Sequence, residues 1–502
     1  MDQVVVPSEA LAPPVLEQLA QEVGALRDEM LASEAELSDV LAATHPDNRA
    51  SARNLVHYLA LRRHDIRDLQ MRLARVGLSS LGRSEPHVLV TLQRILEMLA
   101  LARDTSVPDM TAPPVDFRKG EQILAANAER LLGPSPDHRK ARIVVTLPAK
   151  AASDPCVAMD LVEAGMNCAR INCARDDAEV WTRMAQNVRA AEQALERECR
   201  ILVDLGGPKL RTGPIPNGKK RLKLKTGDQF ELVGEGTCAP RRKKSLKQIT
   251  CATPAIFHAV EKGHRIWFDD GRIGGQVMEA TDSAIRVRVT HAGKGGSKLR
   301  PDRGINLPDT ALAQPALGPK DLSDLAHVSV WADAIELSFA QREEDVLELQ
   351  SALRRHGAEH LAVILKIETR RGFDELPRLL FAAMQGRICG VMIARGDLAV
   401  EIGFERMAEV QEEILWIAEA AHVPTIWATQ VMESLAKEGT MSRAEVTDAA
   451  MSGRAEAVML NKGPYVLEAI RALDDILARM QEHQSKKRQL YRALGVSAGL
   501  WE

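Results

Sequence analysis

The sequence of 502 residues predicts an α/β protein: a (β/α)8 (TIM) barrel with an inserted small β-rich lid domain and an α-helical N-terminal region. From residue 141 onward, eight short apolar runs of strand length recur, and amphipathic helical segments follow most of them. Strands that alternate with helices indicate a parallel sheet, and eight such units close into a barrel. After the third run, turn-rich alternating segments replace this rhythm, which predicts an inserted antiparallel domain.

The N-terminal region contains no convincing strand. Apolar residues recur there at helical spacing, from Leu16 to Met30 and again from Leu55 to Leu73. Arginines between Arg53 and Arg75 could form an anion-binding face, but the interleaved Glu, Asp and Leu make a solvated amphipathic face the ordinary explanation. The predicted division is a helical region at 1–138, the barrel at 139–212 and 305–482, the lid at 213–304, and a tail at 483–502.

The barrel and the lid are predicted from particular segments. The eight predicted barrel strands are ARIVVTL, NCARIN, RILVDL, ADAIELS, LAVILKI, ICGVMIA, VPTIWAT and EAVMLN. Amphipathic helices are predicted at 155–165, 177–198, 341–356, 372–384, 404–420, 443–453 and 464–482. Segments such as RLKLKTGDQFELVG and AIRVRVTHAG alternate like antiparallel strands. Inserted after the third strand, they would lie over the rim of the barrel as a lid.

The composition excludes some classes of partner. Lys and Arg number 66 and Asp and Glu 69, so the formal charge of -3 gives no global electrostatic case for nucleic acid or an anionic membrane. No apolar stretch reaches the roughly 18 residues of a membrane helix. The acidic start lacks the basic segment of a signal peptide, so we expect a cytoplasmic location.

Polar residues gather at the predicted carboxyl ends of the strands, where the chemistry of such barrels lies. Lys366 and Glu368 are two apart on one strand, so both face the interior, and Asp397 follows the next strand. Two carboxylates with water and substrate oxygens are the usual ligands of Mg2+. Lys366 and Glu368 could instead form a purely structural ion pair. The other polar residues at strand ends are Arg170, Asn172, Asp204, Ser338, Arg395, Thr429, Gln430, Asn461 and Lys462.

A divalent cation, a lysine and an arginine in one pocket favour an anionic, phosphorylated substrate. Phosphoryl transfer needs alignment and positive charge spread over the moving group, and this set of residues supplies both. Backbone N–H groups of the turn at 394–397, where Gly396 allows close approach, could hold a substrate carboxylate.

Over residues 141 to 480 the sequence resembles the pyruvate kinase family. The matching segments, in order, are LVEAGMNCARIN, VDLGGPKLRTG, WFDDGRI, RGINLPD, LKIETRRGFDEL, GVMIARGDLAVEIGFE, TIWATQVMESL, SRAEVTDAA and EAVMLNKGPYVLEAI. The resemblance implies a phosphotransferase of glycolysis. It would transfer the phosphoryl group of phosphoenolpyruvate to ADP, giving ATP and an enolate. Protonation of the enolate would then give pyruvate. A homo-oligomer is expected.

The resemblance also implies roles by matching position. Glu368 and Asp397 would hold Mg2+ or Mn2+, and Lys366 would steady the transferred phosphoryl group and the enolate. Arg170 would contact the phosphate, and Thr429 would lie in the proton-delivery network. The turn of Arg395, Gly396 and Asp397 would receive the substrate carboxylate, and Asp270 belongs to the closing lid.

The sequence departs from the family pattern in the region that holds a monovalent cation. Where N-F-S-H-G is usual, this chain has Asn172-Cys173-Ala174-Arg175-Asp176, so a hydroxyl is missing. Where T-K-G-P-E is usual, it has Leu205 to Lys209, so a lysine replaces the acid beyond Asp204. A fixed ammonium can replace a bound K+, and in the family this lysine accompanies independence from K+. We therefore expect that K+ is not required.

The residues expected near the nucleotide depart further from the family pattern. Arg175 replaces a histidine that usually lies near the nucleotide, and NKGPYV after the last strand is shorter than its family counterpart. Arg175, Arg211 and Asn461 are the residues expected on this side. Two alternatives to a pyruvate kinase stay open: a catalytically weak binding or regulatory protein on the same barrel, and a lyase of the phosphoenolpyruvate/pyruvate barrels.

Overall fold

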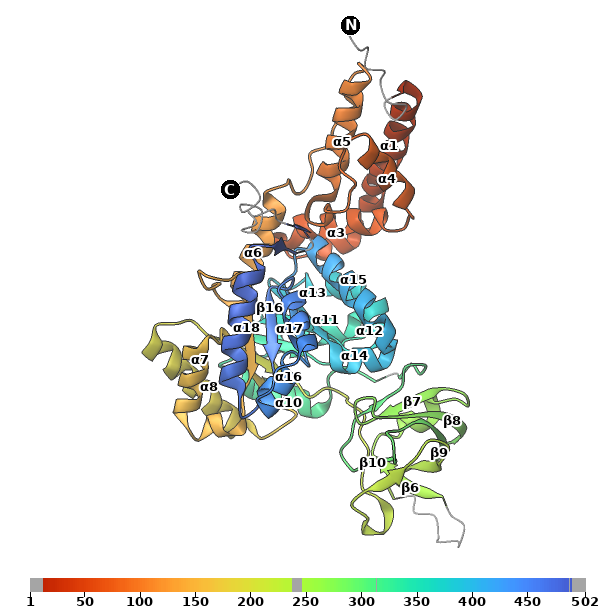
Figure 1. Cartoon of the computed structure of the whole chain (residues 1–502), viewed down its shortest axis with the longest axis vertical. Coiled ribbons are helices and arrows are strands. Elements are labelled where there is room, and N and C mark those ends of the chain that lie inside the picture. The colour runs from red at the N-terminus through yellow and green to blue at the C-terminus, as the bar shows by residue number, and fades with distance from the viewer. Residues whose placement is uncertain (1–11, 237–245, 313, 487, 490–502) are drawn as a thin grey trace, which may run out of the picture.

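The computed structural model describes residues 12–236, 246–312, 314–486 and 488–489. Along the longest axis, N-terminal helices stand at one end, the barrel in the middle and a β-rich lid at the other end (Figure 1). This confirms the predicted fold class. Within the described residues, no helix is both long enough and apolar enough to cross a membrane.

The N-terminal region is helical throughout its described residues. Its helices are α1 (Pro13–Glu36), α2 (Ser38–Ala43), η2 (Pro46–Asn48), α3 (Arg49–Leu61), α4 (Arg67–Arg75), η3 (Glu85–His87), α5 (Val88–Ala102) and α6 (Lys119–Leu132). The spaced apolar residues of α1, such as Leu19, Val23 and Met30, are fully buried. Arg53 and Arg72 bond to Glu34 and Glu22 of α1, which favours the amphipathic interpretation of the arginine-rich stretch.

Eight parallel strands close the barrel, in the spatial order β1-β16-β15-β14-β13-β12-β3-β2. They are β1 (Arg142–Thr146), β2 (Cys168–Asn172), β3 (Arg200–Asp204), β12 (Ala334–Leu337), β13 (Ala362–Ile367), β14 (Cys389–Ala394), β15 (Thr425–Ala428) and β16 (Ala457–Leu460). Each lies within one of the eight predicted runs, so the barrel prediction is confirmed.

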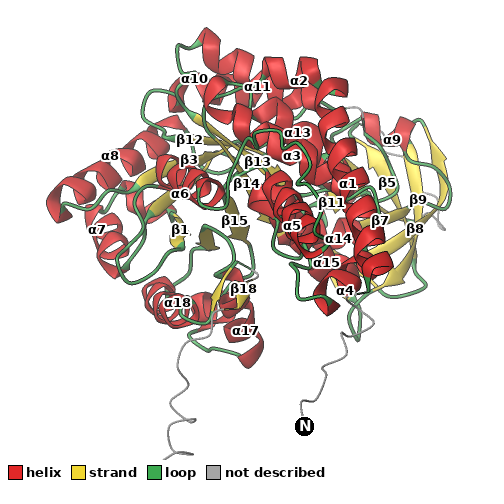
Figure 2. Ribbon diagram, turned by 90° about the horizontal axis from the view of Figure 1, so that it is seen from above, coloured by secondary structure: helices red, strands yellow, loops and turns green. Residues whose placement is uncertain are grey.

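Helices enclose the strands, as the view from above shows (Figure 2). They are α7 (Pro155–Ala164), α8 (Ala178–Leu195), α10 (Pro319–Val328), α11 (Glu343–Arg355), α12 (Arg370–Asp374), α13 (Leu376–Ala383), α14 (Arg395–Ile402), α15 (Met407–Ala420), α16 (Glu433–Glu438), α17 (Arg443–Ser452) and α18 (Val466–Met480). Short helices η4 (Ala149–Ala152) and η6 (Phe404–Arg406) lie between them. The single helix predicted at 372–384 is two helices, because a second helix, α13, begins there with Pro377 in its first turn.

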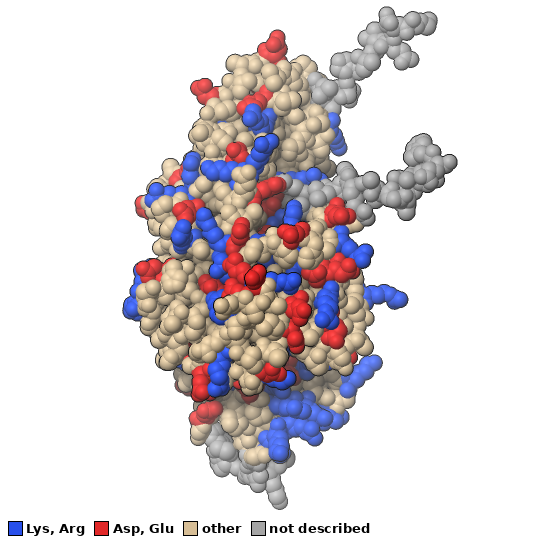
Figure 3. Space-filling view, turned by 90° about the vertical axis from the view of Figure 1, so that its left-hand side faces the viewer, with Lys and Arg blue, Asp and Glu red and all other residues tan. Residues whose placement is uncertain are grey.

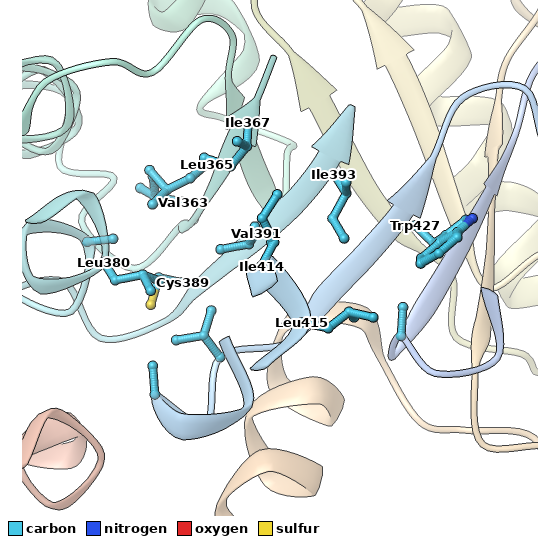
Figure 4. Packing of buried hydrophobic residues seen from close by; sticks show 14 of the residues in the cluster. Val363, Leu365, Ile367, Leu380, Cys389, Val391, Ile393, Ile414, Leu415 and Trp427 are labelled. Atoms are coloured by element: carbon cyan, nitrogen blue, oxygen red, sulfur yellow. The ribbon is translucent and has the colours of Figure 1, made fainter. Parts of the chain in front are cut away.

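The two faces of the strands are buried differently. Val363, Leu365 and Ile367 of β13 pack in the large cluster that includes Leu380 of α13 and Ile414 of α15 (Figure 4). Ile364, on the alternate face, belongs to a smaller cluster inside the barrel. Because side chains alternate along a strand, Lys366 lies on the interior face with Ile364.

Helix α6 closes the end of the barrel that faces the N-terminal region. Its last residues, Leu131 and Leu132, belong to the interior cluster with Val144 and Ile364. The Cys168 thiol donates to the carbonyl of Leu132 at 3.3 Å, and a Cβ on Gly390 would approach Leu131 to 2.5 Å. The N-terminal region therefore plugs the amino ends of the strands, opposite the carboxyl ends where the predicted site lies.

Polar contacts also join the N-terminal region to the loop between α15 and β15. The Asn54 amide donates to the carbonyl of Ala420 and the Asn127 amide to that of His422, both at 2.8 Å. The His422 imidazole lies 2.9 Å from Ser51 Oγ through Nδ1 and 2.9 Å from the carbonyl oxygen of Pro86 through Nε2. These contacts hold the region in one orientation on the barrel.

We expect His422 to make the protein acid-sensitive. Burial lowers the pKa of His422 from its ordinary 6.5 to about 4. An unfolded chain therefore binds the proton first, and stability falls as the pH drops from 6.5 towards 4, by up to about 3 kcal/mol. Urea unfolding of the wild type and His422→Gln at pH 7.5 and 5.0 measures the effect.

The glutamine variant should lose less stability between the two pH values than the wild type. His327→Gln, which changes an exposed histidine of α10, serves as the control and should behave as the wild type. Equal pH dependence in the His422→Gln variant and the wild type would contradict the assignment.

The lid contains a six-stranded sheet in the order β11-β7-β8-β9-β5-β6 and a two-stranded ribbon of β10 and β4. Its elements are η5 (Pro216–Gly218), β4 (Leu222–Leu224), β5 (Gln229–Gly234), β6 (Lys247–Cys251), α9 (Ala255–Ala259), β7 (Arg265–Phe268), β8 (Ile273–Thr281), β9 (Ala284–His291), β10 (Ser297–Leu299) and β11 (Ile305–Asn306). The sheet thus reaches Asn306, beyond the predicted end of the lid at 304. Lys and Arg gather at the lid end of the surface in Figure 3.

Little of the predicted C-terminal tail is described. Strands β17 (Gln484–Ser485) and β18 (Arg488–Gln489) form a short hairpin after α18. Residues 490–502 lie outside the described residues.

Candidate active site

Lys366 lies at the centre of a polar cluster at the carboxyl ends of the strands. Its Nζ is 2.7 Å from Asp204 Oδ1, 2.6 Å from Ser338 Oγ and 3.3 Å from Glu368 Oε1. All four side chains are buried. Lys366 and Glu368 point the same way because they stand two apart at the end of β13, while Asp204 and Ser338 come from neighbouring strand ends.

Arg170 of β2 lies in the same cluster, held by three acceptors. Its Nε donates to Glu336 Oε2 at 2.9 Å and its Nη1 to Thr146 Oγ1 at 3.0 Å, while Nη2 bonds to Asp204. Sequence reasoning did not identify Glu336. The signal was present, because Glu336 stands two residues before Ser338 on a predicted strand and so shares its face.

Burial and the neighbouring charges set the ionisation of the cluster. Burial opposes the charge on Lys366, yet Asp204 and Glu368 raise the pKa of Lys366 above its ordinary value. Burial would likewise raise the pKa of Asp204, but Arg170 and Lys366 hold it below its usual range. The site therefore holds a charged Lys366 ammonium and a charged Arg170 guanidinium away from bulk water. Electrostatic interactions with a bound anion are stronger there than in water.

Of the two carboxylates predicted to bind metal, Glu368 belongs to this cluster and Asp397 lies beside it. Glu368 accepts a hydrogen bond from the Phe339 N–H at 2.8 Å. Asp397, in the first turn of α14, accepts from Lys209 Nζ at 2.9 and 3.0 Å and from the Asn306 amide at 3.3 Å. Burial and the charge of Asp397 both raise the pKa of Glu368, so these carboxylates repel each other.

This donor set fits a hard divalent cation. A bound cation would relieve the repulsion between Glu368 and Asp397, and carboxylate oxygens are the ligands that Mg2+ prefers. Among the described residues, no group of three His, Cys, Asp or Glu side chains is arranged to hold a metal. The remaining ligands would therefore be water and substrate oxygens, which is usual for Mg2+.

Thr429 and the turn at Gly396 meet at the edge of the cluster. Thr429 Oγ1 accepts a hydrogen bond from the Gly396 N–H at 2.8 Å. Thr429 and Gln430 have φ of 66° and 60°, a left-handed backbone that is strained for residues other than glycine. Such strain is concentrated at functional sites.

Arg395 is directed elsewhere. Its Nη2 donates to Asp448 Oδ2 at 2.8 Å and to the Thr429 carbonyl at 2.6 Å, and its guanidinium stacks over Trp427. These contacts tie the start of α14 to the end of β15. The side chain predicted to bind substrate is therefore engaged in holding Thr429 in place.

The residues predicted around the monovalent cation are not all brought together. Asn172 Oδ1 accepts from the Ala174 N–H and so closes its own turn. Lys209 bonds to Asp397, as described above, and within the described part of the chain its ammonium forms no hydrogen bond to Asn172 or Asp204. A Cβ on Gly304 would meet Lys209 Cε at 3.1 Å and Asp270 Oδ1 at 3.8 Å, which places the lid turn of Asp270 near Lys209.

On the predicted nucleotide side, two of three residues converge. Arg175 Nη1 lies 3.9 Å and Arg211 Nη1 3.6 Å from the carboxylate of Asp302 in the returning lid segment. Asn461 is exposed, and its side chain accepts from the N–H of Lys462. The structure therefore pairs the two arginines across the lid boundary and leaves Asn461 apart from them.

A cleft of about 530 Å³ lies between the returning lid segment and the barrel. Asn306, Leu307, Phe339, Thr369 and Glu401 contribute to its lining. Its size is that of a small-molecule site. Burial raises the pKa of Glu401 to about 7. Because Asn306 bonds to Asp397 and Thr369 follows Glu368, the cleft adjoins the two carboxylates.

Comparisons with known proteins match the larger part of this chain to one family. A family model described as "Pyruvate kinase, barrel domain" matches residues 138–470. Pyruvate kinase of Geobacillus stearothermophilus is 33% identical over 353 residues, which cover 68% of this chain and 57% of the relative. The Bacillus licheniformis enzyme is 31% identical over 365 residues, covering 70% of this chain and 59% of the relative. The chain thus spans less than three fifths of the length of these two relatives.

Two further comparisons cover more of the matched protein. Pyruvate kinase of Thermotoga maritima is 31% identical over 370 residues, covering 71% of this chain and 73% of the relative. The crystal structure of a pyruvate kinase from Cryptosporidium parvum matches with a TM-score of 0.62 at 26% identity, covering 70% of this chain and 72% of that chain.

Proposed function

The chain belongs to the pyruvate kinase family, and we propose that it transfers the phosphoryl group of phosphoenolpyruvate to ADP, giving pyruvate and ATP. One observation carries the proposal: the buried ammonium of Lys366 and the guanidinium of Arg170 lie together beside two carboxylates that fit a divalent cation. Preorganised positive charge is the main requirement of phosphoryl transfer.

Each residue has a part in this proposal. Arg170 holds the phosphoryl group of phosphoenolpyruvate, and Lys366 stabilises the charge that develops on the transferred group and on the enolate oxygen. Glu368 and Asp397 would hold Mg2+ or Mn2+, which when bound supplies further positive charge to the substrate oxygens.

Thr429 belongs to the route by which the enolate gains a proton. Its Oγ1 accepts from the Gly396 N–H, so its own O–H hydrogen stays available to donate. Arg395 keeps Thr429 in this position through the bond to the Thr429 carbonyl.

Arg175 and Arg211 hold the phosphates of ADP in this proposal. Both guanidiniums lie at the lid boundary and are balanced by the single carboxylate of Asp302. Two arginines that share one carboxylate keep N–H donors for a polyphosphate.

A coupled assay tests the function. The full chain is incubated with phosphoenolpyruvate, Mg2+ and each of several nucleoside diphosphates, and pyruvate and triphosphate are both measured. Pyruvate with an equal amount of triphosphate supports a kinase. Pyruvate without triphosphate would instead indicate a lyase or a hydrolase. No turnover, with a melting temperature that rises in Mg2+ and phosphoenolpyruvate, would indicate a binding protein.

We expect turnover without added K+. The Lys209 ammonium forms an ion pair with Asp397 and so supplies a fixed positive charge at the site. The rate of pyruvate formation should therefore be the same in K+, Na+ or tetramethylammonium at constant ionic strength. Lys209→Gln should lower the rate about 10-fold or more, because one charged donor is removed from the site. Lys262→Gln, an exposed lysine of the lid, is the control. A strict requirement of the wild type for K+ would refute this expectation.

A further inference from the structure

Glu336 is a fully buried carboxylate that belongs to none of the roles described above. It stands on β12, in register with Asp204 of β3 on one side and Ile364 of β13 on the other, and its exposure is 0%. Its Oε2 accepts from Arg170 Nε at 2.9 Å. Its Oε1, also buried, has no hydrogen-bond partner among the described residues.

Stability does not explain a glutamate at this place. Burying a carboxylate costs free energy that an ion pair often only just recovers, and a whole buried ion pair can commonly be replaced by well-packed apolar side chains without loss of stability. Arg170 already has Asp204 as a counter-ion and Thr146 as a further acceptor. Burial raises the pKa of Glu336, which shows that the site disfavours its charge. A buried carboxylate that costs folding free energy, next to an arginine proposed to bind substrate, points to a functional role.

The hydrogen-bond inventory of Arg170 shows what Glu336 adds. A guanidinium has five N–H hydrogens in one plane. Three are taken, by Glu336 at Nε, Thr146 at Nη1 and Asp204 at Nη2. One hydrogen therefore remains on each Nη. Without Glu336, only the two outer nitrogens would be held, and the Nε–H would itself be free to bind an anion in a different orientation.

We propose that Glu336 is a positioning residue, which fixes the plane of the Arg170 guanidinium so that its two remaining N–H donors meet the phosphoryl group of the substrate. The inference rests on the proposed function, because it assigns Arg170 to that group. Glu336 acts through Arg170 and does not itself touch the substrate. What it supplies is the acceptor at Nε, which an amide oxygen can also provide.

Two substitutions separate positioning from packing. Glu336→Gln keeps an acceptor for Arg170 Nε, whereas Glu336→Leu keeps the volume and removes the acceptor. We expect the glutamine variant to retain kcat/KM for phosphoenolpyruvate within about threefold, and the leucine variant to lose about 10- to 100-fold, as when a preorganised contact is lost. The melting temperature of the leucine variant should fall, because the buried Nε–H of Arg170 loses its acceptor, so kcat/KM is compared at a temperature at which both variants are folded.

The matched control is Asp333→Asn. Asp333 immediately precedes β12 and pairs with Arg189 at 2.8 Å at the amino end of the same strand, so this change, like Glu336→Gln, removes a carboxylate charge beside an arginine and keeps an acceptor, but it lies away from the site. It should keep the wild-type kcat/KM. The rise in melting temperature caused by phosphoenolpyruvate with Mg2+ gives a second readout that does not need turnover. It should shrink in the leucine variant only.

The outcomes are distinct. A folded leucine variant with a kcat/KM within about twofold of the wild type would overturn the role of Glu336, and so would equal losses in the glutamine and leucine variants. A wild type without turnover would instead reject the proposed function. The thermal readout then still decides on Glu336: a smaller shift in the leucine variant supports the positioning role, and equal shifts in the leucine variant and the wild type overturn it.

Discussion

Lys366→Met is expected to lower pyruvate formation by about 10³-fold or more while the chain stays folded. The ammonium of Lys366 is held 2.7 Å from Asp204 and 2.6 Å from Ser338, and its raised pKa keeps it charged. Methionine fills a similar volume but carries no charge, so in the proposed reaction the transferred phosphoryl group and the enolate would lose a fixed positive charge. The loss should appear in kcat, because the negative charge that the Lys366 ammonium stabilises develops in the transition state.

The steady-state assay is paired with Mn2+ titration of the variant. Mn2+ should still bind, because Glu368 and Asp397 are unchanged. Lys437→Met, on the exposed ion pair with Glu433 of α16, is the control and should keep the wild-type rate. A near-normal rate in Lys366→Met would refute the role of the lysine and favour a purely structural ion pair.

The double variant Leu131→Ala, Leu132→Ala is expected to lose about 4–8 kcal/mol of unfolding free energy. Both leucines at the end of α6 are fully buried and pack with Val144 and Ile364 inside the barrel. Such a loss approaches the whole stability of an ordinary domain, roughly 5–15 kcal/mol, so much of the chain should be unfolded or molten at 37 °C.

Urea unfolding of the two single variants and the double variant measures this effect. Leu101→Ala, on a side chain of α5 that is 66% exposed, is the control and should change stability by less than about 0.5 kcal/mol. A double variant within about 1 kcal/mol of the wild type would show that α6 is not needed to close the barrel.

Local patterns in the sequence were sufficient for the barrel and for part of the site. Eight strand-length runs followed by helices became eight parallel strands, because periods of two and of 3.6 residues are properties of consecutive residues. The same period of two placed Lys366 and Glu368 on one face. It would also have placed Glu336 with Ser338, but an isolated glutamate in an apolar run was not recognised as inward-facing.

The lid boundary shows a limit of this reasoning. The alternating segments indicated an antiparallel domain, yet β11 joins its sheet only by pairing with β7, far back along the chain. Turn residues mark where a strand can end, but the partner across the sheet decides which sheet a short strand joins.

The sequence by itself determined the barrel, the inserted lid, the helical N-terminal region and the family, because these depend on local periodicity and on long ordered segments. Only the tertiary structure decided which partners the charged side chains take: Glu336 on Arg170, Lys209 on Asp397, and Arg395 on Asp448. It alone showed that α6 plugs the barrel. Such contacts join residues tens to hundreds of positions apart, and their geometry exists only once the strands have closed.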